Sequence, residues 1–210
     1  MTESQTEGED RFPDVSTGMK TAGIVTALSV IAYASVFILL ASRAHGSAAI
    51  LIASLGLAAA LLALAYIDLR TGLLLDVINF PLIAAGIVWA VFAAPGTGVG
   101  WLHSVLGAAL GYGLIAGLAY AWRRWRGYEG IGLGDAKLLA AGGAWVGVTM
   151  LPVILFVAST TGLLVALIVS VRSQSTGDRV ALPFGPCLAL GIWIVWCLTH
   201  SSFHILSVPG

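Results

Sequence analysis

The chain has 210 residues, of which 59% are hydrophobic and only 10% are charged, with ten basic residues balanced by ten acidic ones. A soluble domain carries about 25% charged residues. Here the charges fall in short clusters between apolar runs of roughly 17 to 25 residues, the length that spans a bilayer. The composition therefore excludes an ordinary soluble domain and predicts an all-α fold, a polytopic integral membrane helix bundle.

The first nineteen residues form an acidic tail with five acids and one arginine. A secretory signal needs a basic start and a small-residue cleavage site, and this stretch has neither. Its composition is typical of disorder. We predict a disordered cytosolic tail over 1–19, a membrane-embedded domain over 20–204 and a short C-terminal tail over 205–210.

Seven apolar runs are candidates for helices. They cover 21–42, 47–67, 77–95, 99–121, 137–150, 152–171 and 183–200, with Pro152 marking the turn into the sixth. Placing the N-terminus in the cytoplasm puts nine of the ten basic residues inside and only Arg43 outside, and the opposite orientation reverses that ratio. The positive-inside rule thus predicts about seven transmembrane helices with a cytoplasmic N-terminus.

Small residues four positions apart recur in two of these runs. They are Gly107 and Gly111, then Gly113 and Gly117, in the fourth run, and Gly143 and Gly147 in the fifth. Such pairs let helices approach closely in lipid. We expect them to pack helices within the bundle rather than between copies, although a homo-oligomer stays open.

No pattern in the sequence indicates a metal or nucleotide site. Cys187 and Cys197 would lie roughly 15 Å apart on one helix, too far for a disulfide, and no Cys-x-x-Cys pair exists. The four histidines lack metal-ligand spacing. Gly130, Gly132 and Gly134 alternate without the register of a nucleotide-binding loop. We therefore expect no metal, no cofactor and no nucleic-acid partner.

Beyond the tail, the acidic residues are few, and the predicted topology places all of them on the cytoplasmic side: Asp68, Asp76, Glu129, Asp135 and Asp178. Asp68 ends the second run and Asp135 begins the fifth, at membrane edges where ionisation is expensive. Two carboxylates held close in a poorly solvated site share a proton, so that one takes a proton from water while the other polarises a carbonyl. This is aspartic-protease chemistry, and the pair titrates as a unit, so neither residue is given a fixed role.

Each of these acids also has a plainer interpretation. The alternating glycines are expected to keep the chain out of a helix up to Asp135, which could then be an N-cap. Asp68 could instead pair with Arg70. Asp76 is expected to cap the third run rather than to catalyse.

Glu129 and Lys137 flank the glycine-rich stretch. Glu129 is expected to form a solvated ion pair with the arginine cluster over 123–126 rather than to act in catalysis. Lys137 either tunes Asp135 electrostatically or marks the inner edge of the membrane.

Three signatures, in order along the chain, resemble those of the type IV prepilin peptidases. Asp68 followed at eight positions by Asp76, with Pro81 beyond, is similar to the first family motif. Gly132-Leu-Gly-Asp135 resembles the Gly-x-Gly-Asp motif, and Leu182-Pro-Phe-Gly-Pro186 resembles a third signature. A lone Gly-x-Gly-Asp is weak because presenilin-type proteases share it, whereas three signatures in order over about 60–191 are specific.

The resemblance implies a polytopic aspartic endopeptidase of the inner membrane, in a type IV pilus or type II secretion system. Such an enzyme removes the basic leader peptide of prepilins or pseudopilins on the cytoplasmic side, next to the apolar helix of the substrate. The family's catalytic pair maps to Asp68 and Asp135. Residues expected to bind substrate or support the pair are Asp76, Glu129, Gly132, Gly134 and Lys137.

The sequence departs from the family pattern in two places. Leu75 stands where the family usually has proline before the acid aligned with Asp76. The N-terminal domain with paired Cys-x-x-Cys motifs, linked to N-methylation by S-adenosylmethionine, is replaced by the acidic tail, so methyltransferase activity is not expected.

Two other classes of function stay open on the residues alone. One is a proton-coupled transporter that uses the same two aspartates as a relay. It would have acids near mid-bilayer and inverted repeats, which this sequence does not show. The other is a non-catalytic assembly subunit of a pilus or secretion system.

Overall fold

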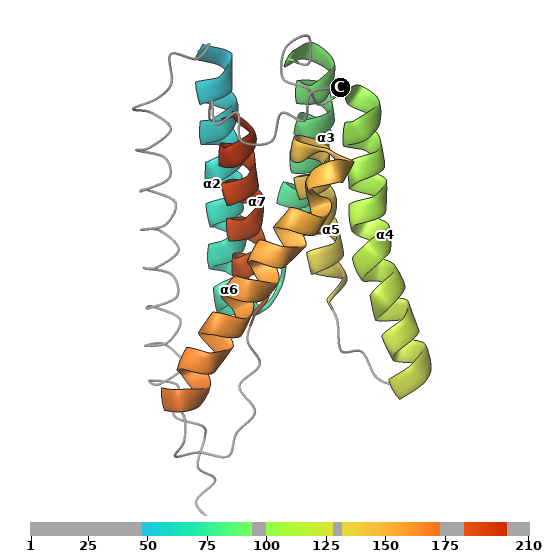
Figure 1. The fold of residues 1–210 in the computed structure, drawn as a ribbon, viewed down its shortest axis with the longest axis vertical. Coiled ribbons are helices and arrows are strands. Elements are labelled where there is room, and N and C mark those ends of the chain that lie inside the picture. The colour runs from blue at the N-terminus through green and yellow to red at the C-terminus, as the bar shows by residue number, and fades with distance from the viewer. Residues whose placement is uncertain (1–47, 94–99, 128–131, 173–182, 201–210) are drawn as a thin grey trace, which may run out of the picture.

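A computed structural model describes residues 48–93, 100–127, 132–172 and 183–200. Within these ranges the chain is entirely helical (Figure 1). The elements are α2 (Ala48–Thr71), α3 (Asp76–Ala93), α4 (Trp101–Arg126), α5 (Leu133–Val146), the short 3-10 helix η1 (Val148–Met150), α6 (Leu151–Arg172) and α7 (Gly185–His200). The all-α prediction is confirmed for this part of the chain. The predicted helix over 21–42 and both tails lie outside the described residues, and the orientation of the bundle stays a prediction.

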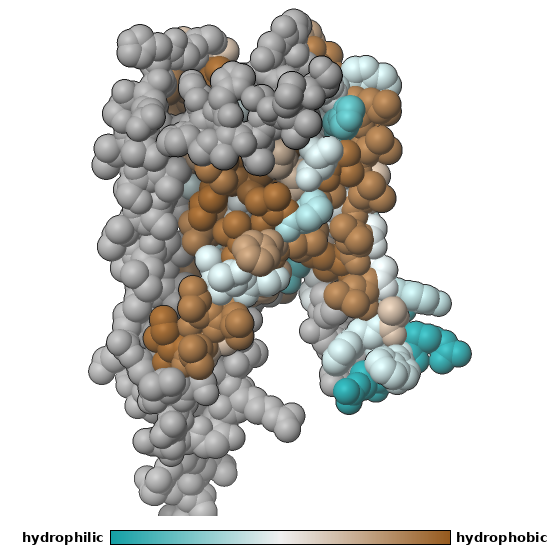
Figure 2. Space-filling view, in the orientation of Figure 1, coloured by the Kyte–Doolittle hydropathy of each residue, from teal (hydrophilic) through white to brown (hydrophobic). Residues whose placement is uncertain are grey.

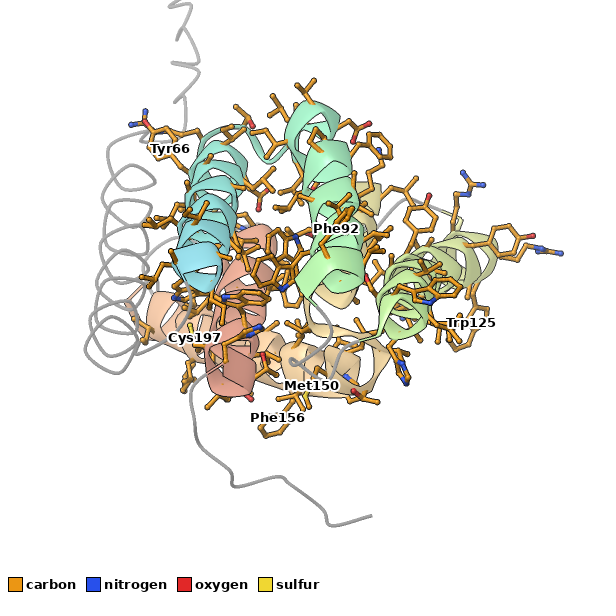
Figure 3. All side chains as sticks on the ribbon, turned by 90° about the horizontal axis from the view of Figure 1, so that it is seen from above. Tyr66, Phe92, Trp125, Met150, Phe156 and Cys197 are labelled. Carbon is orange, nitrogen blue, oxygen red and sulfur yellow. The ribbon has the colours of Figure 1, made fainter. Side chains whose placement is uncertain are left out.

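The described helices have the apolar surface of a membrane protein. Three segments are long and apolar enough to cross a bilayer: α2, α4 and the stretch Val148–Ile168. Figure 2 shows hydrophobic side chains along most of α4 and a hydrophilic cluster at one end of it, the end that carries its basic residues. Phe156 and Trp125, which are 73% and 86% exposed, point away from the bundle in Figure 3. Large apolar side chains that face outward are expected where the surroundings are lipid.

Helix α5 is the centre of the bundle, with ten of its fourteen residues buried. It packs against α4, α3 and α7. A Cβ atom on Gly143 would collide with the carbonyl oxygen of Gly107, and one on Gly111 would also meet the α5 backbone, so α4 and α5 touch backbone to backbone. Packing within the bundle is therefore confirmed for these glycines. A Cβ atom on Gly113 or Gly117 would meet nothing within 4 Å among the described residues.

The turn between α5 and α6 lies at Gly147 rather than at Pro152, which corrects the prediction from sequence. Gly147 has a φ of 84°, in the left-handed region that glycine adopts at little cost. Helix α6 already begins at Leu151, so Pro152 lies in its first turn. The N–H groups of a first turn have no partner within the helix, so a proline costs no hydrogen bond there.

Two tryptophans tie the central helices to their neighbours. The indole N–H of Trp145 on α5 donates to the carbonyl of Leu82 on α3 at 2.9 Å, and that of Trp196 on α7 donates to the hydroxyl of Ser54 on α2 at 3.0 Å. The two indole rings meet edge to face with their centroids 5.2 Å apart. These contacts tie the C-terminal parts of α5 and α7 to each other and to α3 and α2.

Candidate active site

The end of α2 and the starts of α3, α5 and α7 lie at the same end of the bundle, the lower end in Figure 1. This end holds a cavity of about 670 Å³. Both Asp68, from the last turn of α2, and Asp135, from the first turn of α5, line it. We call it the aspartate cavity. Asp76, Lys137, Gly132 and Gly134 line it too, together with residues of the α2–α3 loop.

The carboxylate of Asp68 is held by the start of α7. Its side chain is buried, with only 6% of the residue exposed, and its Oδ2 atom accepts a hydrogen bond of 3.1 Å from the backbone N–H of Gly185. Gly185 is the first residue of α7, where unpaired N–H groups and the helix dipole favour an anion. The alternative of an ion pair with Arg70 is wrong, because the guanidinium of Arg70 lies over the ring of Tyr66 at 5.2 Å.

Helix α2 continues to Thr71, past the end at residue 67 expected from hydropathy, so Asp68 lies inside the helix. The helix closes at Gly72, whose N–H donates to the carbonyl of Asp68 at 2.8 Å. Gly72 has a φ of 65°, which allows the chain to reverse immediately after the helix. The reversal brings the α2–α3 loop back to the mouth of the aspartate cavity.

Asp135 occupies the third residue of α5 and is not its N-cap, which corrects two predictions from sequence. The helix begins at Leu133, Gly132 is the N-cap residue, and Gly134 is already helical. The burial of α5 against three neighbouring helices outweighs the low helix propensity of glycine. A carboxylate in the first helical turn interacts favourably with the helix dipole.

The environment of Asp135 makes it harder to ionise than an ordinary aspartate. Asp135 lies outside the three membrane-length segments. Burial, and to a smaller extent the negative charge of Asp68, together raise the pKa of its carboxyl from 3.8 to about 6. A carboxyl with such a pKa exchanges its proton close to neutral pH. The two aspartates are therefore near enough to influence each other, as a proton-sharing pair must be.

The two described glycines of the Gly-x-Gly-Asp motif differ in what they do. A Cβ atom on Gly134 would lie 2.9 Å from the Cβ atom of Leu74, so a glycine here lets the α2–α3 loop pack on the first turn of α5. Gly132 has a φ of −71° and no atom nearer than 4.0 Å to such a Cβ. Close packing thus explains Gly134 but not Gly132. Glu129 and Gly130 lie outside the described residues.

Asp76 and Lys137 form an ion pair at the rim of the aspartate cavity. The Lys137 Nζ atom lies 2.6 Å from Oδ1 and 2.7 Å from Oδ2 of Asp76. The expected capping role of Asp76 is wrong, because α3 already begins at Asp76 and the first helical N–H, that of Asn79, bonds to the carbonyl of Leu75 at 3.1 Å, so Leu75 holds the N-cap position. The pair instead ties the start of α3 to α5. The sequence analysis did not predict that Lys137 pairs with Asp76.

Two residues that the sequence analysis did not assign to the site belong to it. Phe184 lines the aspartate cavity, and Gly185 lies so close that a Cβ atom there would collide with the Asp68 carboxylate. Both lie in the Leu182–Pro186 signature that opens the last apolar run. The signature was visible in the sequence, but its contact with Asp68, which is 117 positions away, was not.

Within the described residues, no three His, Cys, Asp or Glu side chains gather as a metal ion would require. Cys187 and Cys197 are both free and buried, in agreement with the predicted absence of a disulfide between them.

Comparison with known families bears directly on this site. The model of the type IV leader peptidase family matches residues 55–167, which are 113 of the 210 residues and include both aspartates. The chain belongs to the type IV leader peptidase family. Membership favours a peptidase over the transporter and the assembly subunit that the residues alone left open.

Several relatives of this family have names that describe an activity. A prepilin leader peptidase/N-methyltransferase of Burkholderia pseudomallei (strain 1026b) is 40% identical over 126 residues, which are 59% of this chain and 38% of the relative. The protein of the same name from Neisseria gonorrhoeae is 36% identical over 65% of this chain and 45% of the relative. The one from Escherichia coli (strain K12) is 40% identical over 60% of this chain and 53% of the relative.

The matched segments thus make up between 38% and 53% of the length of these three relatives. No solved structure gives a significant match to the chain.

Proposed function

We propose that this protein is an aspartic endopeptidase that removes the leader peptide of prepilins or pseudopilins at the cytoplasmic face of the inner membrane. The observation that carries the proposal is that Asp68 and Asp135, from helices far apart in the sequence, line one cavity at one end of the bundle. Family membership supplies the reaction class, and the names of the relatives supply the substrate.

The chemistry needs only the two carboxyl groups and a water molecule. The ionised carboxylate takes a proton from the water molecule while the water oxygen attacks the scissile carbonyl carbon. The protonated carboxyl donates a hydrogen bond to the carbonyl oxygen. The tetrahedral intermediate then collapses, the C–N bond breaks, and the leaving nitrogen receives a proton. Because the pair titrates as a unit, the roles of base and acid are assigned to Asp68 and Asp135 together and not to either residue alone.

Two features of the cavity suit this mechanism. The N–H of Gly185 fixes one oxygen of Asp68, so that carboxylate is oriented before substrate arrives. Burial keeps Asp135 difficult to ionise, which favours a state with one proton on the pair. A proton relay for transport would instead need both carboxylates deep in the bundle, and here they lie in the last turn of α2 and the first turn of α5.

The test is cleavage of a co-expressed prepilin, read as a shift in gel mobility. Asparagine keeps the size of aspartate but removes its ionisable proton, so Asp68→Asn and Asp135→Asn should each abolish cleavage at normal membrane abundance. Asp76→Asn should still cleave, because that carboxylate is engaged by Lys137. Normal cleavage by either of the first two variants, or no cleavage by the wild type, would contradict the proposal.

A further inference from the structure

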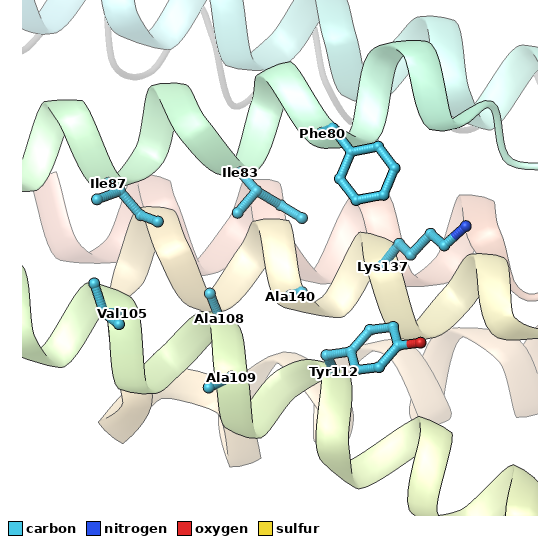
Figure 4. A pocket seen from close by; sticks show the side chains of 9 residues that line it. All are labelled: Phe80, Ile83, Ile87, Val105, Ala108, Ala109, Tyr112, Lys137 and Ala140. Carbon is cyan, nitrogen blue, oxygen red and sulfur yellow. The ribbon is translucent and has the colours of Figure 1, made fainter.

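A second cavity, of about 470 Å³, lies between α3 and α4 over the surface of α5 (Figure 4). We call it the α3–α4 groove. One wall carries Phe80, Ile83 and Ile87 from α3, and the other carries Val105 and Tyr112 from α4. Both helices pack mainly on α5 and only slightly on each other. The groove is therefore a furrow between two ridges of large side chains.

The floor of the groove is made of small side chains. Ala108 of α4 and Ala140 of α5 lie between the two walls (Figure 4), and Ala109, an exposed residue of α4, also lines the groove. In a bilayer, helices do not gain from hiding apolar surface, so they associate where small residues let their backbones come close. An alanine floor between large walls is the surface that such close packing requires.

The groove adjoins the aspartate cavity at a shared lining residue. Lys137 lines both cavities, and it stands at the same end of the groove as Phe80 and Tyr112. Its Nζ atom is bound to Asp76 and lies 5.6 Å from the centre of the Phe80 ring. The groove is thus apolar along its length and reaches charge only at the end next to the two aspartates.

The groove has the length of a helix contact and is open to the surroundings. From Phe80 to Ile87 it follows seven residues of α3, roughly 10 Å or two helical turns. Phe80 is 57% exposed, Tyr112 is 42% exposed and Val105 is 38% exposed.

We propose that the α3–α4 groove seats the apolar helical segment of the substrate. The chain leading out of that helix then passes Lys137 and enters the aspartate cavity. The inference rests on the proposed peptidase function and adds the surface on which the substrate docks. A floor of alanines lets the rigid backbone of a helix come close, whereas a flexible lipid chain needs no such floor. The groove also ends beside two carboxylates, which can act on a peptide but have no role toward an acyl chain.

The first test fills the groove without touching the aspartates. Ala108→Leu should raise the KM for a reconstituted, full-length prepilin by about tenfold and leave kcat nearly unchanged, because a larger side chain obstructs docking. The matched control is Ala85→Leu, at an exposed alanine of α3 that does not line the groove. An unchanged KM in Ala108→Leu, an equal rise in Ala85→Leu, or a loss confined to kcat would overturn the inference.

The second test reads docking without cleavage. In an Asp135→Asn background, a cysteine at Ala109 should form a disulfide with a single cysteine in the apolar segment of the prepilin, and a cysteine at Ala85 should not. Equal crosslinking at both positions, or none at Ala109, would overturn the proposal that the substrate docks in the groove, even where the wild type cleaves normally. A wild type that cleaves no prepilin would instead remove the proposed function, so the two failures are distinguishable.

Discussion

Replacing Gly185 by alanine tests how the pair of aspartates is held. The N–H of Gly185 donates a 3.1 Å hydrogen bond to Asp68, and an alanine Cβ atom at this position would collide with the same carboxylate. The Asp68 side chain must then rotate and lose its donor. Because a hydrogen bond to a charged group contributes about 1.5–3 kcal/mol, we expect Gly185→Ala to slow cleavage by about 10- to 150-fold.

The assay is the rate of prepilin cleavage by each variant at equal membrane abundance. Gly191→Ala is the matched control, because its Cβ atom would lie 2.9 Å from the carbonyl oxygen of Ile154 and so strains the packing of the same helix away from Asp68. It should keep its activity per folded molecule. If Gly185→Ala cleaves at the wild-type rate, or Gly191→Ala loses as much activity per folded molecule, the reasoning about Gly185 is wrong.

Three further predictions concern stability and packing. The pKa of Asp135 is raised to about 6, so its contribution to stability is present at low pH and is lost as pH rises through about 6. Asp135→Asn should therefore be more stable than wild type by about 1–3 kcal/mol at pH 8, an advantage that shrinks below pH 6. Thermal unfolding in detergent across this range checks it, and a difference that does not vary with pH would refute it. Lys137→Met removes the ion pair with the half-exposed Asp76, and it should lower the free energy of unfolding by no more than about 1 kcal/mol. A double-mutant cycle with Asp76→Asn measures the coupling, and a value well above that limit would count against a solvent-screened pair. Gly143→Ala should lower the unfolding temperature strongly because its Cβ atom meets the α4 backbone, whereas Gly113→Ala, with open space around it, should not. Similar unfolding temperatures for these two glycine variants would contradict the packing of α4 on α5.

The sequence by itself determined the class of the fold and the candidates for chemistry. Apolar runs long enough to span a bilayer exclude most folds other than a helix bundle, because backbone polar groups in lipid must be satisfied within each segment. Within so apolar a chain, Asp68 and Asp135 stand out because a carboxylate at a membrane edge is costly to keep. The family signatures around them were equally local and therefore visible without a structure.

Only the tertiary structure decided which groups meet. The start of α5 at Leu133 depends on how deeply that helix is buried, which outweighs the local preference of its glycines. The pairing of Lys137 with Asp76 spans 61 positions, and the hydrogen bond from Gly185 to Asp68 spans 117. Such contacts depend on how whole helices pack side by side, and no periodicity or propensity along the chain encodes that arrangement.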